Sequence, residues 1–131
     1  MKNLIKIVLL SFIFSSCDPA SSLEATIENL TSQSLVIDFV SSNSNENKTI
    51  NIKTNETVVF QEGFDIGSTY LEPSLTEYDS VVVKNETQDV LKVYKSDDIS
   101  RNIYRIDDWD SSEPSKRYFK YNYKIENSDF Q

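Results

Sequence analysis

Short segments in which apolar and polar residues alternate constrain the fold of this chain more than any other feature. The clearest lies at 119–125, where two tyrosines, a phenylalanine and an isoleucine alternate with Lys120, Asn122 and Lys124. A period of two is typical of a half-buried β-strand with one polar face. No apolar period of 3.6 residues continues over three turns, so we expect no long helix. The sequence therefore predicts an all-β protein.

Further segments with strand chemistry precede the C-terminal one. They are 23–30, 34–40, 49–53, 57–61, 80–84 and 89–95. Turn-forming residues separate them and no helical segment intervenes, which favours an antiparallel β-sandwich, immunoglobulin-like, with about seven strands. We assign residues 23–131 to this single domain. A small β-barrel is the alternative, because the same alternation suits a closed sheet.

Two connections between these segments are long. Residues 62–77 contain both glycines of the chain, and residues 96–116 combine several apolar residues with many charges. Loops of this length without structure are uncommon and often functional. The other interpretation is that each connection hides a short strand or a helical turn, whose apolar residues cap an open end of the sandwich.

The N-terminal segment has the composition of a targeting signal. Lys2 and Lys6 form a positively charged region, an apolar run from Ile7 to Phe14 follows, and two serines then precede Cys17. Because a helix needs roughly twenty apolar residues to span a bilayer, this run is too short for a lasting transmembrane segment. An ordinary secretory signal cleaved near the serines, or a buried N-terminal strand, are the alternatives that the composition leaves open.

The same segment resembles a bacterial lipoprotein signal peptide covering residues 1–16. The resemblance implies that Cys17 is lipidated and becomes the first residue of the mature protein, with residues 17–22 as a short tether. It also implies two or three acyl chains, and two or more chains anchor a protein stably, since each buried methylene contributes about 0.8 kcal/mol. The expected partner is therefore the membrane, through lipid on Cys17.

Charge and residue usage exclude several function classes. The chain has 21 acidic and 13 basic residues, a net charge of −8, so a nucleic acid partner is not expected. It contains no histidine and a single cysteine, which removes histidine-based triads and imidazole zinc sites. Paired carboxylates cannot be inferred from sequence spacing alone. We expect no enzyme and no cofactor.

Aromatic residues in the long connections are the candidate binding residues. They are Trp109, Tyr104 and Tyr70. Flat aromatic faces suit sugar stacking or a protein hot spot, whereas a tryptophan in a β-domain also commonly plugs one end of the core. Both interpretations stay open.

A cluster of acidic residues next to Trp109 is the candidate for a weak metal site. Asp107, Asp108 and Asp110 supply the oxygen ligands that calcium prefers. The cluster lacks the alternate spacing and the glycine of an EF-hand loop. A solvated acidic loop is the other interpretation.

Two C-terminal motifs carry a family resemblance. Together with the lipoprotein signal and a single β-domain, residues 101–104 (Arg-Asn-Ile-Tyr) and 121–125 (Tyr-Asn-Tyr-Lys-Ile), followed by Asp129, resemble small cell-envelope lipoproteins of Bacteroidetes-type bacteria. The resemblance implies a lipid-anchored protein of the cell envelope, at the outer membrane. Asp79-Ser80-Val81 is similar to an O-glycosylation acceptor of such envelopes, which implies modification of Ser80, although the tripeptide also suits an ordinary strand start.

These observations lead to one expected function and one alternative. We expect a non-enzymatic envelope lipoprotein that binds another envelope protein or a glycan through its long loops. The alternative is an immunity-type or structural lipoprotein that neutralises a protein partner through an acidic surface.

Overall fold

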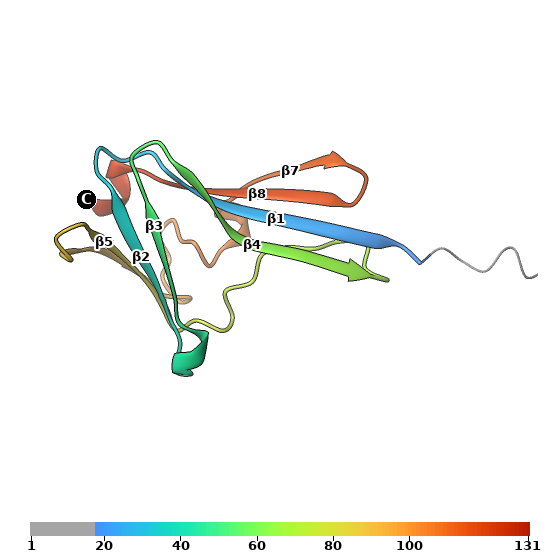
Figure 1. Ribbon diagram of the computed structural model, residues 1–131, viewed down its shortest axis with the longest axis horizontal. Coiled ribbons are helices and arrows are strands. Elements are labelled where there is room, and N and C mark those ends of the chain that lie inside the picture. Colours follow the sequence, from blue (N-terminus) through green and yellow to red (C-terminus); the bar gives the residue numbers. More distant parts are fainter. Residues whose placement is uncertain (1–17) are drawn as a thin grey trace, which may run out of the picture.

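Two four-stranded sheets make up the part of the chain that the structure, a computed structural model, describes: residues 18–131 (Figure 1). The predicted signal peptide and Cys17 lie outside the described residues. Sheet 1 has the order β4-β1-β8-β7 and sheet 2 the order β3-β2-β5-β6. The strands are β1 (Ala20–Asn29), β2 (Leu35–Val40), β3 (Lys48–Ile52), β4 (Thr57–Ile66), β5 (Ser80–Asn85), β6 (Val90–Tyr94), β7 (Asp110–Ser115) and β8 (Tyr118–Ile125).

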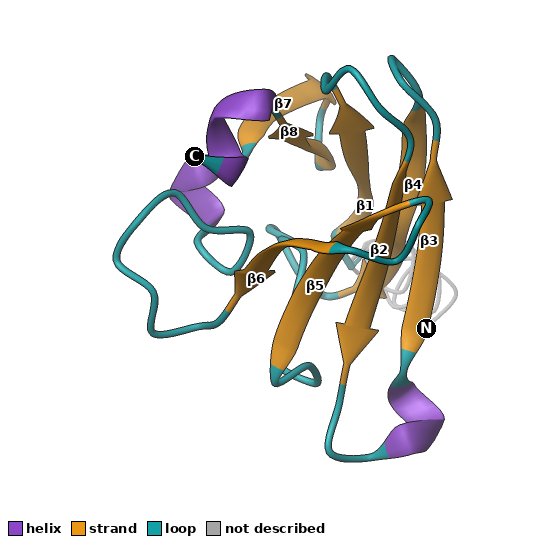
Figure 2. Cartoon of the chain, turned by 90° about the vertical axis from the view of Figure 1, so that its left-hand side faces the viewer, coloured by secondary structure: helices purple, strands orange, loops and turns teal. Residues whose placement is uncertain are grey.

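Three helical turns join or end these strands, as Figure 2 shows. They are η2 (Ser44–Glu46), η3 (Ile106–Asp108) and η4 (Asn127–Phe130). No helix within residues 18–131 has the length and apolar content needed to cross a bilayer.

Strand β1 lies at the centre of sheet 1 because both of its edges are paired. It runs antiparallel to β4 and parallel to β8, with Ile27 opposite Val58 on one side and Tyr123 on the other. All other strand pairs are antiparallel. The first and last strands of the domain are therefore hydrogen-bonded neighbours.

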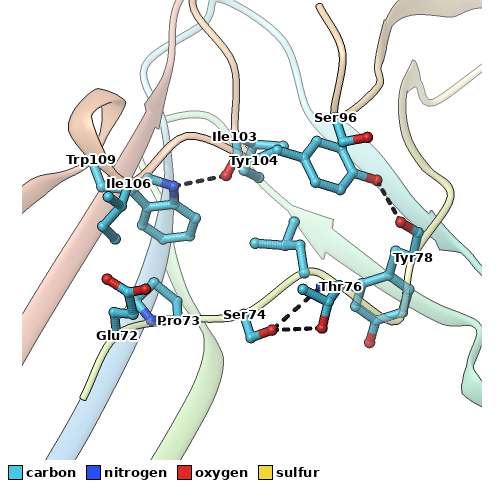
Figure 3. A pocket seen from close by; sticks show the side chains of 11 residues that line it. Glu72, Pro73, Ser74, Thr76, Tyr78, Ser96, Ile103, Tyr104, Ile106 and Trp109 are labelled. Carbon is cyan, nitrogen blue, oxygen red and sulfur yellow. Dashed lines mark hydrogen bonds between the residues drawn. The ribbon is translucent and has the colours of Figure 1, made fainter. Parts of the chain in front are cut away.

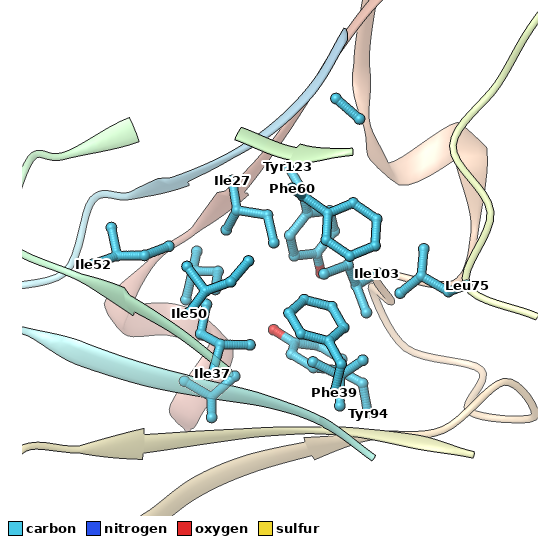
Figure 4. Packing of buried hydrophobic residues seen from close by; sticks show 14 of the residues in the cluster. Ile27, Ile37, Phe39, Ile50, Ile52, Phe60, Leu75, Tyr94, Ile103 and Tyr123 are labelled. Carbon is cyan, nitrogen blue, oxygen red and sulfur yellow. The ribbon is translucent and has the colours of Figure 1, made fainter. Parts of the chain in front are cut away.

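The alternation read from the sequence builds the core. In β1 and β8 every second side chain points toward sheet 2, and all of these except the half-buried Phe119 are buried, including Ile27 and Tyr123. Phe39 of β2 meets them from the other sheet and stacks on Phe60, with ring centroids 4.8 Å apart (Figure 4). Offset aromatic packing of this kind adds to the free energy of burial.

The predicted sandwich is confirmed, with eight strands where about seven were expected. The additional strand is β7, which was hidden in the long connection 96–116. All six of its residues are exposed, and it is held as an edge strand by β8. The described strands form two separate sheets rather than the closed sheet of the barrel alternative.

The predicted tether at 17–22 is wrong for its last three residues. Residues 20–22 belong to β1 and pair with 64–66 of β4, a strand that extends five residues beyond its predicted end. The carbonyl of Pro19 also accepts a hydrogen bond from the N–H of Gly67. Pairing with the longer β4 therefore incorporates these residues into the sheet.

Candidate binding site

A pocket of about 500 Å³ lies between the two long connections, here called the first connection (67–79) and the second connection (95–109) (Figure 3). Specific ligand sites usually have volumes of roughly 300–1,000 Å³ and an apolar lining with a few polar groups. The lining residues are Glu72, Pro73, Ser74, Leu75, Thr76, Tyr78, Ser96, Ile103, Tyr104, Ile106 and Trp109.

The floor of the pocket is apolar and continuous with the core. Leu75, Ile103 and Trp109 are all buried, Trp109 to the point that 5% of its surface remains exposed. The indole Nε1–H donates to the carbonyl of Ile103 at 2.8 Å. The indole also packs against Tyr123, with ring centroids 5.4 Å apart. The floor is therefore fixed by both packing and a hydrogen bond.

Two half-buried tyrosines form one wall. The hydroxyl of Tyr104 donates to the carbonyl of Tyr78 at 3.2 Å and so ties the two connections together. Burial, with a smaller contribution from Asp79, raises the pKa of Tyr104 to about 12. Burial, followed by the charges of Glu77 and Glu46, also raises the pKa of Tyr78. Both phenols therefore stay neutral at physiological pH.

The rim of the pocket is polar and negatively charged. Glu72, Thr76 and Ser96 line it and are exposed. Glu77 and Asp79 are exposed and adjoin lining residues in the sequence, as do the exposed Lys95 and Arg105. Among the lining residues themselves the one charged side chain is Glu72, so a cationic group meets attraction at this part of the opening.

A buried asparagine shapes the second connection. The side chain of Asn102 is not exposed, and its Nδ2 donates to the carbonyl of Lys95 at 2.6 Å. Its Oδ1 accepts from the N–H of Tyr104 at 3.1 Å. Asp108 accepts from the N–H of Asn102 at 2.9 Å and closes the loop. These bonds place Ile103 and Tyr104 at the pocket without regular secondary structure.

The candidate metal ligands are not brought together. Asp108 is occupied by Asn102 and lies 3.7 Å from Arg105, whereas Asp110 forms an ion pair with Lys124 at 2.7 Å. Asp107 is exposed in η3. Within residues 18–131, no three acidic or cysteine side chains converge on a common point that would hold a metal ion.

The three candidate aromatic residues separate into two places. Trp109 and Tyr104 line the pocket, whereas Tyr70 is not among the lining residues. Tyr70 is 54% exposed and packs edge-on against Phe119, with ring centroids 5.1 Å apart. Its hydroxyl accepts a hydrogen bond from that of Tyr121 at 2.9 Å. Tyr70 therefore packs on the inner face of sheet 1, over the first half of β8.

The candidate modification site is at a strand start. Ser80 is the first residue of β5, is half-buried and lies opposite Val40 of β2. The N–H of the preceding Asp79 donates to the carbonyl of Val40 at 2.7 Å. Modification of Ser80 stays a prediction.

Sequence reasoning missed the residues that the first connection contributes. Leu75 and Tyr78 have no periodic neighbours, and Pro73 carries no strand or helix signal. The available signal was the length of the connection together with its apolar content. Such a signal indicates a packed loop without identifying which side chains face inward.

A second hollow, also about 500 Å³, lies on the outer face of sheet 1. Its charged groups already have partners, since Glu24 and Lys120 form an ion pair at 2.8 Å and Asp110 pairs with Lys124. The Lys120 hydrogen bond lowers the pKa of Glu24. The pocket between the connections is therefore the better candidate site.

Comparisons of the chain with protein-family models, curated proteins and solved structures found no significant match.

Proposed function

We propose that the chain is a non-enzymatic, lipid-anchored protein of the cell envelope that binds another envelope protein. The observation that carries the binding proposal is the pocket between the connections, with its apolar floor and acidic rim. The side chains and hydrogen bonds of the two connections preform this pocket. When a site is preformed, binding does not have to order its loops, so the entropy cost of forming the complex is smaller.

The geometry favours a protein segment over a glycan as the ligand. Sugar stacking needs an open aromatic face, but Trp109 is 5% exposed and Tyr104 is half-buried. An apolar side chain, in contrast, is complementary to a floor made of Leu75, Ile103 and Trp109. The acidic rim suits lysine or arginine beside that side chain.

The second candidate, an immunity-type lipoprotein acting through its acidic surface, is favoured by the rim charges and the net charge of −8. The two candidates differ in their response to salt. Binding steered by exposed charges weakens strongly as salt rises, whereas burial of an apolar side chain weakens little.

The binding proposal is tested by photo-crosslinking on living cells. A photoreactive amino acid at Thr76, on the pocket rim, is compared with one at Glu86, in the β5–β6 turn. Both sites are exposed, but Glu86 lies at the opposite end of sheet 2 from the first connection. We expect one protein to be captured from Thr76 and not from Glu86. Equal capture from both sites would contradict the proposal.

A blocking variant gives an independent readout. Ser96→Trp places a large side chain on an exposed lining position and leaves the buried floor unchanged. It should abolish capture from Thr76, and Glu86→Trp should not. Repeating the capture at low and high salt separates the two candidate functions.

The anchor is tested separately by the intact mass of the protein extracted from membranes. Lipidation adds acyl chains to Cys17, and Cys17→Ala should give a soluble or unprocessed product. Unchanged partitioning of that variant into the detergent phase would contradict the anchor.

A further inference from the structure

At one end of sheet 1, the start of β1 pairs with the end of β4, and this end carries the most exposed large apolar side chains of the two sheets. Phe64 is 68% exposed and Ile66 is 64% exposed, both near the end of β4. Phe64 pairs with Ser22 of β1, which in turn pairs with Tyr118 of β8, and Ile66 pairs with Ala20. Partners in register share one face of a sheet, so these five residues, here called the apolar tip, lie on the outer face of sheet 1.

A row of charges bounds the apolar tip. The next row on the same face consists of Glu62, Glu24 and Lys120, of which the last two are an ion pair. At roughly 3.4 Å per residue, Phe64 and Ile66 are separated by about 7 Å along the strand. This depth matches the roughly 5–10 Å to which interfacial protein segments enter a bilayer.

The apolar tip is also the end of the domain nearest to Cys17. The N–H of Gly67 binds the carbonyl of Pro19, and the chain enters β1 at Ala20, so the sheet begins three residues after the cysteine. Two residues span at most about 7 Å, which is the reach from Cys17 to Pro19. Figure 1 shows the start of β1 and the end of β4 side by side at one extremity of the domain.

The charges at this end do not favour an anionic surface. The turn between β7 and β8 supplies Lys116 and Arg117, and the carbonyl of Arg117 accepts from the N–H of Ser22 at 2.9 Å. Asp18 and Asp65, near the start of β1 and the end of β4, offset both bases. Contact with a membrane would therefore depend on the apolar side chains and vary little with salt.

We propose that the apolar tip rests in the headgroup region of the membrane to which the chain is anchored, with Phe64 and Ile66 inserted toward the acyl chains. This inference rests on the proposed anchor at Cys17. A tether too short to lift the sheet away from the bilayer holds these two side chains at its surface. Aromatic and aliphatic side chains are stabilised at the boundary between the lipid headgroups and the acyl chains.

The test uses the full chain extracted from membranes and reconstituted into phosphatidylcholine vesicles with brominated acyl chains. Phe64→Trp adds a reporter at an exposed position, and Ile99→Trp is the matched control because Ile99 is 95% exposed in the second connection. The native Trp109 is buried and gives a constant background. We expect the added emission of Phe64→Trp to shift to shorter wavelength and to be quenched by bromine, and that of Ile99→Trp to do neither.

The intact mass of each sample shows whether Cys17 carries lipid, and so separates failure of the membrane contact from failure of the anchor. If Cys17 carries lipid and Phe64→Trp is not quenched, or both variants are quenched equally, the inference is overturned and the anchor stands. A blue shift without quenching, as when a second copy covers the tip, also overturns it. If Cys17 carries no lipid, both the anchor and the membrane contact are overturned.

Discussion

Asn29 joins the two sheets through a buried hydrogen-bond network that a single atom exchange should break. Its side chain is not exposed, and its Oδ1 accepts from both the N–H and the hydroxyl of Thr31, at 2.9 and 2.7 Å. Its Nδ2 donates to the carbonyl of Gln33 at 2.8 Å and to that of Ile52, at the end of β3, at 3.2 Å. Asn29 ends β1, so the second donated bond crosses from sheet 1 to sheet 2.

Asn29→Asp preserves the shape and both acceptor bonds but removes both donor bonds. A buried acceptor left without a partner costs roughly 1–3 kcal/mol. The carbonyl of Ile52 loses its side-chain donor, whereas that of Gln33 keeps the hydroxyl of Thr31 at 2.9 Å, so the lost donor bonds together cost roughly 1–3 kcal/mol. The carboxylate that faces them adds a desolvation cost. Because domains of this size are stable by roughly 5–15 kcal/mol, the variant should lose a large part of its free energy of unfolding at neutral pH.

The sign of the pH dependence follows from burial. Burial among carbonyl oxygens disfavours the ionised form, so the new carboxyl has a folded-state pKa above its unfolded value of about 3.9. Its neutral form can donate to one carbonyl. The deficit relative to the wild type should therefore be smallest below about pH 4 and grow as pH rises through the folded pKa.

Urea denaturation followed by the fluorescence of Trp109, the single tryptophan of the chain, measures this deficit. Asn47→Asp is the matched control, because Asn47 is exposed and its Oδ1 accepts from the N–H of Ser41 at 2.7 Å. The control should stay within about 0.5 kcal/mol of the wild type. An Asn29→Asp variant as stable as the control, or a deficit that grows toward low pH, would refute the reasoning.

Three further predictions concern single groups. Tyr94→Phe removes a buried hydroxyl without a partner among the described residues and should leave stability unchanged or raise it by about 1–3 kcal/mol at most. Tyr121→Phe removes one hydroxyl proton that the Tyr70 hydroxyl and the Leu71 carbonyl share, at a cost of about 0.5–1.5 kcal/mol, and urea midpoints compare the two variants. The Lys84 hydrogen bond holds the pKa of Asp38 below its usual value, so the stability from this part-exposed pair is present above about pH 4 and lost as pH falls through the lowered pKa. Asp38→Asn should remove that acid dependence, worth at most about 1 kcal/mol in acid titrations of stability. Gly67 has φ +99°, so Gly67→Ala should lower the thermal midpoint at a cost on the order of 1–2 kcal/mol.

The strands that face the core could be predicted from the sequence because burial imposes period two on them. Residues 119–125 lie in β8 with the predicted alternation, and the sandwich follows from several such segments. Strand β7 could not be found in this way, since none of its residues is buried and Pro114 interrupts it. It exists because a turn with Arg117 at φ 61° folds it back on β8. An exposed edge strand forms because it pairs with a neighbouring strand. The pattern of apolar and polar residues along the sequence does not show that pairing.

The candidate site was predictable in part for the same reason. Trp109 and Tyr104 stood out as aromatic residues in a long connection, and the structure places both at the pocket. Tyr78 comes from the first connection, 26 positions before its hydrogen-bond partner Tyr104. Contacts of this kind depend on which loops the two sheets bring together. Neither the composition nor the periodicity of a sequence indicates which loops come together.

The register of sheet 1 also fixes how far the pocket lies from the apolar tip. Trp109 directly precedes Asp110, which pairs with Asn122, and Asn122 pairs with Thr26 of β1. Thr26 is six residues along the strand from Ala20, or about 20 Å at roughly 3.4 Å per residue. A tip seated in the headgroups therefore leaves the pocket on the aqueous side of the interface, within reach of a protein partner. If vesicles with brominated chains quenched Trp109 itself, this orientation would be wrong even with the tip in contact.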